Sequence, residues 1–347
     1  MAKDKHILHT RVSKILMEDM FKIKPGETVA ITADLTSDRA IVDALASATS
    51  AAGGIPMVIL VPRAEKESQA GMPYWPSKAL TAALCKVDVW IEANSMVLLY
   101  SDIWETAMQD NKKLRYLIIG NSSIESLDRI FTGFDIQSLK QLLNKTREKV
   151  LACKTIRITS KNGTDVSYDI DLNYAFDIDD GDYSKPKFGT APGFVNIVPK
   201  IESMNGTIVF DFLQNGEKGS QLEFIMKNST IIDVRGEAEA SEKFKAYLAS
   251  FNDPNMYKIS HNMLGLNPKV RALSGDVAED ERIWGGADFG FGHTSPMDMP
   301  PLGQVAKSHF DGGVTNVSVY LDAIQIFDNG DVCHPDLRPL ADNLLNK

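Results

Sequence analysis

The stretch Pro25-Gly26-Glu27-Thr28-Val29-Ala30-Ile31-Thr32-Ala33 decides the fold of the first part of the chain. Pro25-Gly26 predicts a turn, and the apolar run 29–33 that follows predicts a buried strand. Ser37-Asp38 then supplies an N-terminal cap for a helix that we expect to end at Gly53-Gly54. The apolar run 57–61 predicts the next strand. This order of strand, helix and strand is typical of a parallel sheet.

The same alternation continues up to about residue 152. We expect helices over 77–86, 101–110 and 136–151, and strands over 87–92 and 115–119. The sequence therefore predicts an α/β domain over residues 1–152 with a mostly parallel sheet and a Rossmann-like topology. No GxGxxG follows a predicted strand and no GxxxxGKS/T occurs, so the glycine-rich loops that bind nucleotides are missing. We interpret this domain as a scaffold.

From Lys154 onward the pattern becomes β-rich. Residues 155–159 and 166–170 alternate apolar and polar side chains around Asn162-Gly163, which predicts a β-hairpin. One helix is expected over about 239–251, and further strands are expected over 207–210, 221–225, 230–234, 317–321 and 324–327. The sequence thus predicts a second domain over residues 153–347, a β-rich α+β domain that carries the candidate metal ligands.

Composition limits the classes of partner. Lysine and arginine number 37 and aspartate and glutamate 46, which gives the 347-residue chain a net charge of −9. Excess negative charge repels phosphate groups, so we expect neither nucleic acid nor a membrane as a partner. The three cysteines are odd in number and far apart, and no run of 18 apolar residues occurs. We therefore expect a soluble, cytoplasmic protein and, at this size, a homo-oligomer with closed symmetry.

Three residues of the second domain could share a metal ion. His309 and Asp311 form an HxD on a segment that reads as extended, and the period of two in a strand puts both side chains on one face. His261 lies where another predicted strand ends in a turn. Two histidines and one carboxylate are the set that holds non-haem Fe(II) on one face and leaves the other positions for substrate and oxygen. The alternative, a chance HxD without a shared site, stays open on spacing alone.

His293 has two interpretations. In Gly292-His293-Thr294-Ser295-Pro296 it reads either as a polar loop residue or as an acid/base group or substrate contact near the same site. Histidine titrates in the range that acid/base chemistry needs, and the preceding glycines suit the edge of a pocket.

Several segments resemble the 2,5-dihydroxypyridine dioxygenase family, whose fold is shared with the aminopeptidase T metallopeptidases. The resemblance covers nearly the whole chain and is most specific in five segments: Phe251-Asn252-Asp253-Pro254, Ile259-Ser260-His261, Leu264-Gly265-Leu266-Asn267-Pro268, Ser308-His309-Phe310-Asp311 and Val319-Tyr320-Leu321-Asp322. It implies one Fe(II) per chain, held by His261, His309 and Asp311. It also implies an oxidoreductase that uses O2 to open a hydroxylated aromatic or N-heteroaromatic ring, such as a dihydroxypyridine.

The chain departs from both relatives at single positions. The aminopeptidases carry a glutamate where His261 stands and a metal-binding histidine where Asp288 stands, so the two-metal peptidase alternative would lose two ligands. Tyr100 stands where the dioxygenases have an active-site histidine, and it could either hydrogen-bond a substrate hydroxyl or be a core aromatic. We expect Tyr100 from the first domain and His293 from the second to handle protons across the domain cleft. A catalytically silent relative is the third alternative.

Overall fold

The computed structural model describes residues 2–346, which form two compact units. The first unit runs to Gly133 and takes in Gly181–Pro192, and the second comprises Phe134–Asp180 and the chain from Gly193 onward. Within residues 2–346, no helix has both the length and the apolar composition that crossing a membrane requires.

A parallel sheet of five strands forms the frame of the first unit, in the order β2-β1-β3-β4-β8. The predicted parallel sheet is thereby confirmed. Its strands are β1 (Thr28–Asp34), β2 (Ile55–Val61), β3 (Val89–Glu92), β4 (Arg115–Ile118) and β8 (Lys187–Gly189). The helical elements of this unit are α1 (Ala2–Ile15), η1 (Leu16–Met20), α2 (Arg39–Ala51), η2 (Ser68–Tyr74), α3 (Ser77–Leu84), α4 (Asp102–Asp110) and α5 (Ile124–Phe131).

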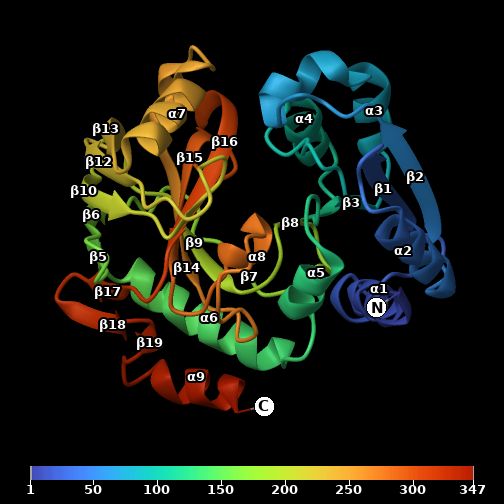
Figure 1. The fold of residues 1–347 in the computed structure, drawn as a ribbon. Helices are drawn as coiled ribbons and strands as arrows, with labels where there is room; N and C mark the ends of the chain where they lie inside the picture. Colours follow the sequence, from blue (N-terminus) through green and yellow to red (C-terminus); the bar gives the residue numbers. More distant parts are fainter. Residues whose placement is uncertain (1, 347) are drawn as a thin grey trace. The chain divides into compact units, whose positions relative to one another are not determined.

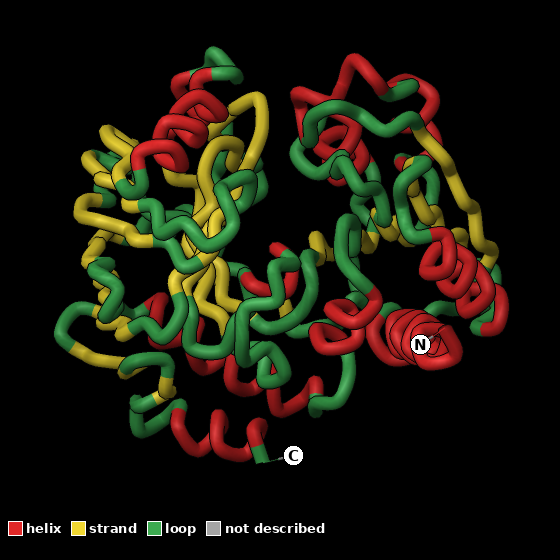
Figure 2. The backbone as a smooth tube through the Cα atoms, viewed as in Figure 1, coloured by secondary structure: helices red, strands yellow, loops and turns green. Residues whose placement is uncertain are grey.

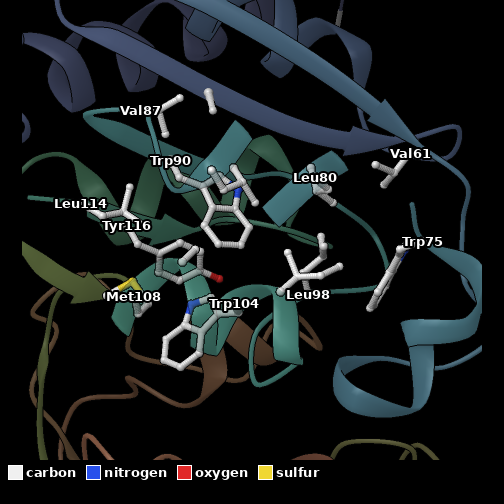
Figure 3. Packing of buried hydrophobic residues seen from close by; sticks show 14 of the residues in the cluster. Val61, Trp75, Leu80, Val87, Trp90, Leu98, Trp104, Met108, Leu114 and Tyr116 are labelled. Carbon is white, nitrogen blue, oxygen red and sulfur yellow. The ribbon is translucent and has the colours of Figure 1, made fainter. Parts of the chain in front are cut away.

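Large aromatic side chains fill the core of this unit (Figure 3). Trp90 on β3 is fully buried, its ring packs edge-on against Tyr116 at 4.7 Å, and its Nε1 donates to Thr32 Oγ1 at 2.9 Å. Trp104 on α4 also packs edge-on against Tyr116, with ring centroids 5.9 Å apart. The predicted start of α2 is confirmed, because Asp38 accepts a hydrogen bond from Ala40 N–H.

Two antiparallel sheets dominate the second unit, and strands are drawn in yellow in Figure 2. The larger has eight strands in the order β13-β12-β10-β6-β5-β17-β18-β19, and the smaller has six in the order β11-β16-β15-β14-β9-β7. The strands of the larger sheet are β5 (Thr155–Thr159), β6 (Asp165–Asp169), β10 (Asn205–Val209), β12 (Glu223–Lys227), β13 (Thr230–Arg235), β17 (Ser318–Leu321), β18 (Ile324–Asp328) and β19 (Asp331–Val332). Those of the smaller sheet are β7 (Ile178–Asp179), β9 (Phe194–Ile197), β11 (Phe212–Leu213), β14 (Ile259–Gly265), β15 (Ala287–Thr294) and β16 (Gln304–Val314). The helical elements are α6 (Ile136–Leu151), α7 (Ala238–Ala249), η3 (Pro254–Tyr257), α8 (Val277–Asp280) and α9 (Arg338–Leu345).

The compact units differ from the predicted division at residue 152 in two segments. Helix α6 belongs to the second unit, because its apolar face packs near α9 and β9 rather than on the parallel sheet. The segment Gly181–Pro192 belongs to the first unit, because β8 pairs with β4 at the end of the parallel sheet. The domain boundary itself stays a prediction.

Candidate metal centre

Three neighbouring strands of the second unit, β14, β15 and β16, bring the predicted ligands together (Figure 1). Gly290 in the central strand β15 lies opposite His261 of β14 on one side and opposite Asp311 of β16 on the other. Residues that lie opposite one another in antiparallel strands point to the same face. His309, two residues before Asp311, shares that face, as the HxD spacing predicts.

The three side chains meet at their tips. Nε2 of His261 lies 3.0 Å from Nε2 of His309 and 3.2 Å from Oδ1 of Asp311, and His309 Nε2 lies 3.0 Å from the same oxygen. Two ligands at right angles, each about 2.1 Å from an ion, are about 3.0 Å apart. The spacing therefore fits three ligands on one face of a metal ion. Among the residues that the structure describes, this is the only group of three or more candidate ligands that converge in this way.

Hydrogen bonding fixes the tautomer of His309. Its Nδ1 lies 2.9 Å from the backbone carbonyl of His293, and a carbonyl only accepts, so Nδ1 carries the hydrogen. In the neutral ring, Nε2 is then a lone pair aimed at the Asp311 carboxylate and at His261. The lone pair of His309 Nε2 and the Asp311 oxygen, 3.0 Å apart, repel each other unless a proton or a metal cation lies between them. The donor set thus fits a metal ion, and the carbonyl of His293 is the outer partner that orients the ligand.

Glycine at position 290 makes room for this group. A Cβ there would lie 2.0 Å from Nε2 of His261 and 2.7 Å from Nε2 of His309. The neighbouring side chains in β15, Phe289 and Phe291, point to the opposite face and are fully buried in an aromatic core. In Asp288-Phe289-Gly290-Phe291-Gly292, the alternation of aromatic residues and glycines is the sequence signal for a strand with one packed face and one face kept open.

Charge coupling within the group shifts its pKa values. Burial alone would lower the pKa of His309, but the negative charge and the hydrogen bond of Asp311 outweigh burial and raise it. Burial would raise the pKa of Asp311, yet His309 and His261 hold it well below its usual range. For His261 burial dominates, and its pKa is lowered. The carboxylate is therefore ionised and supplies a fixed negative charge to a cation.

Two further carboxyl groups lie close enough to interact electrostatically with Asp311. Burial, followed by the charge of Asp311, raises the pKa of Glu281 to about 8 and that of Asp288 well above its ordinary value. Asp288 is 1% exposed, and neither of its oxygens has a hydrogen-bond partner within residues 2–346. Arg282 forms an ion pair with Glu281 at 2.9 Å, and its positive charge partly opposes the rise in the pKa of Asp288. Because their pKa values are raised, both carboxyl groups are mainly protonated at neutral pH when no cation lies near them. Sequence reasoning did not find Glu281, which follows the short helix α8 and belongs to no motif.

His293 lies on β15 and is buried, so the interpretation as a polar loop residue is wrong. Its Nδ1 accepts a hydrogen bond from Ala306 N–H at 3.4 Å, and its carbonyl also accepts from Ser260 Oγ at 2.8 Å. The structure therefore places the backbone of His293 against a predicted ligand.

Tyr100 lies in the first unit, in the loop between β3 and α4. Its side chain is 8% exposed and packs edge-on against Trp104 at 5.5 Å and Phe188 at 6.3 Å. Its φ of 65° is in the left-handed region, which a non-glycine residue rarely adopts. Glu92 anchors this loop by accepting from Leu98 N–H, and it also accepts from Tyr116 OH at 2.6 Å.

Comparisons with known proteins place this geometry in context. The profile of the NicX family, described as 2,5-dihydroxypyridine 5,6-dioxygenase, matches residues 15–334. A 2,5-dihydroxypyridine dioxygenase structure from Pseudomonas putida KT2440 has a TM-score of 0.78 at 19% identity, covering 96% of this chain and 99% of that one. Wild-type AmpT from Thermus thermophilus has a TM-score of 0.68 at 12% identity, covering 94% and 99%. Both likenesses concern the fold, and a search of curated proteins found no match.

Proposed function

The chain belongs to the 2,5-dihydroxypyridine 5,6-dioxygenase family, and we propose that it opens a dihydroxypyridine or a related N-heteroaromatic ring with one Fe(II) per chain. It is a ring-cleaving dioxygenase and hence an oxidoreductase that acts on a small aromatic substrate with O2. The proposal adds the metal, its stoichiometry and the residues that hold it.

One observation carries this proposal, the convergence of His261 Nε2, His309 Nε2 and Asp311 Oδ1 within 3.2 Å of one another. Two imidazoles and one carboxylate on one face are the ligand set of non-haem Fe(II) oxygenases. When bound, Fe(II) supplies the redox chemistry that lets a closed-shell aromatic compound react with O2. Asp311 neutralises part of the ion's charge, and the His293 carbonyl holds His309 in the tautomer that leaves Nε2 free to bind.

We assign proton handling to Tyr100 and to His293 as part of the same proposal. The Tyr100 hydroxyl can donate to or accept from a substrate hydroxyl. Replacement by phenylalanine keeps the ring contacts with Trp104 and Phe188, so it isolates the hydroxyl. We expect Tyr100→Phe to lower kcat at least about tenfold, as loss of an acid/base group does. Unchanged kcat would make Tyr100 a core aromatic only.

The side chain of His293 needs a separate test, because its backbone already serves His309. His293→Gln retains the backbone and a polar side chain. We expect a lowered kcat with unchanged metal content. Metal loss in this variant would instead assign His293 to orientation of the ligands.

Anaerobic reconstitution with Fe(II) tests the proposed function directly. Metal analysis of the wild-type chain should give one iron per chain, and oxygen uptake should follow the addition of a dihydroxypyridine. A panel of hydroxypyridines and catechols then identifies the ring that is opened. A chain that binds no iron and takes up no oxygen would leave the catalytically silent relative as the answer.

The peptidase alternative requires two metal ions about 3.5–4 Å apart. Asp288 is not part of the converging ligand group, and no second group occurs within residues 2–346. Two metal ions per chain in the same analysis, with hydrolysis of peptide amides, would favour the peptidase. We further propose that the protein is cytoplasmic and forms a homo-oligomer with closed symmetry.

A further inference from the structure

The outer strand of the parallel sheet in the first unit has an unpaired edge. Strand β2 is last in the order β2-β1-β3-β4-β8, and among the described strands it pairs only with β1 (Figure 1). Its seven residues, Ile55-Pro56-Met57-Val58-Ile59-Leu60-Val61, are all apolar. Ile55, Val58 and Leu60 are exposed by 56%, 39% and 52%. Proteins usually protect such an edge with charged side chains, and β2 has none.

The bonds to β1 show which backbone groups of β2 face outward. Ile55 N–H donates to the Glu27 carbonyl at 2.8 Å, and Gly26 N–H donates to the Gly53 carbonyl at 2.9 Å. The backbone N–H and C=O groups of the odd-numbered residues of β2 therefore point toward β1. Those of residues 56, 58 and 60 point outward, away from the sheet. Pro56 has no N–H, so Val58 and Leu60 are the outward donors of the strand.

We propose that β2 is the interface of a symmetric dimer, in which the β2 strands of two copies of this chain pair antiparallel about a two-fold axis at Val58. This inference rests on the homo-oligomeric state proposed above. With the axis at Val58, Ile55 lies opposite Val61 of the second copy, so the whole strand is paired. Val58 N–H then donates to the Val58 carbonyl of the second copy, and Leu60 N–H donates to the Pro56 carbonyl of the second copy. Every outward N–H finds an acceptor, whereas the Leu60 carbonyl of each copy has no N–H donor opposite it, because Pro56 lacks one.

Charges beyond the strand favour the same partner. No charged residue lies within β2, so the strand pairing itself places no like charges opposite one another. Arg63 is exposed, makes no ion pair among residues 2–346, and in this register lies opposite Gly53 of the second copy. Helix α2 ends just before that glycine and has no basic residue in its last turn. Because the carbonyls at a helix C-terminus carry partial negative charge, Arg63 of each copy complements the helix end of the other.

The oligomeric state of the full chain tests the interface. We expect a dimer for the wild type by sedimentation and light scattering. Val58→Lys places two like-charged side chains directly opposite each other across the axis, on Cα atoms about 5.5 Å apart, and it should weaken dimerisation at least about tenfold. Val58→Thr is the matched control, because it keeps a β-branched side chain of similar size without charge, and it should remain dimeric.

Cysteine cross-linking tests the register. In the proposed pairing the two copies of residue 58 have Cα atoms about 5.5 Å apart, which suits a disulfide. The two copies of residue 60 are offset by four residues, about 14 Å along the strands. Under mild oxidation, Val58→Cys should form covalent dimers, and Leu60→Cys should stay at the wild-type background that Cys85, Cys153 and Cys333 set.

Three results would overturn the inference: a monomeric wild type, a Val58→Lys variant as dimeric as the wild type, or Leu60→Cys cross-linking as readily as Val58→Cys. None of these measurements depends on oxygen uptake. Failure of the proposed dioxygenase function would therefore be seen separately, in the activity of the wild-type chain.

Discussion

Replacement of Gly290 by alanine is expected to abolish metal binding while the chain stays folded. The new Cβ would lie 2.0 Å from Nε2 of His261, which is 1.4 Å short of the 3.4 Å at which ordinary van der Waals contact begins. It would also lie 2.7 Å from Nε2 of His309. Gly290 is not among the glycines with positive φ, so alanine adds no backbone strain there. The whole effect of the substitution is therefore steric, and it acts on the atoms that face the ion.

The size of the effect follows from the tolerance of metal coordination. Metal–ligand distances vary by about 0.2 Å in working sites, whereas the His261 imidazole would have to move by more than 1 Å. Changes to outer partners alone typically cost 10–100-fold in metal affinity, so displacement of a ligand should cost at least about 100-fold, or about 3 kcal/mol. The three atoms nearest the new Cβ all belong to the side chains of His261 and His309, so moving these side chains relieves the crowding without a change in the backbone of the sheet.

Anaerobic titration of the metal-free chain with Fe(II), against a competing chelator, measures this affinity. Gly312→Ala is the matched control, because it crowds the opposite face of the same sheet, with a Cβ 2.6 Å from Leu213 and 2.7 Å from Phe210. We expect the control to lose about 1–3 kcal/mol of unfolding free energy through overpacking and to keep its metal affinity. Wild-type affinity in Gly290→Ala, or an equal loss in Gly312→Ala, would refute the placement of the ion.

Three further outcomes are expected. Asp311→Asn should lower metal affinity at least about tenfold and let the pKa of His309 fall, since the charge of Asp311 is what raises it; metal content and NMR titration of the histidine check both. Burial raises the pKa of Glu92 to about 8 from an ordinary value of 4.5, so the stability linked to this carboxyl is present at low pH and is lost as pH rises toward 8, by about 1.4 kcal/mol per pH unit. Glu92→Gln should remove that slope from denaturant unfolding curves recorded between these pH values, and an unchanged slope would show that another group causes it. Trp90→Ala should cost about 3–5 kcal/mol of unfolding free energy, because it removes a fully buried ring, while metal content at low temperature stays at the wild-type level.

Local patterns predicted the regular elements of the chain well, because each depends on residues close in sequence. The turn at Pro25-Gly26, the cap at Asp38 and the span of α6 all follow from short-range chemistry, and the structure has them where the sequence places them. The HxD spacing likewise put His309 and Asp311 on one face, since the period of two in a strand needs no tertiary information.

What the sequence could not supply depends on contacts between distant segments. The proximity of His261 to His309 results from β15 lying between their strands, and no spacing in the chain specifies that order. No strand is predicted from the sequence over Ala287–Thr294, where the structure has β15 with glycines that keep one face open. The place of α6 in the second compact unit is a matter of the same kind, because an amphipathic helix shows which face is apolar but not which elements that face will cover.

The placement of β8 has a consequence for the order in which the protein can mature on the ribosome. The first unit's sheet takes its last strand from Lys187–Gly189, after 47 residues, Phe134–Asp180, that belong to the other unit. A nascent chain therefore cannot complete the first sheet until these 47 residues of the second unit have been synthesised. Fragments truncated after residue 133 or 152 would leave β4 as a bare edge without Phe188 beside Tyr116. Separate expression of the N-terminal half therefore needs the segment 181–192, which contains β8, supplied by a redesigned connection.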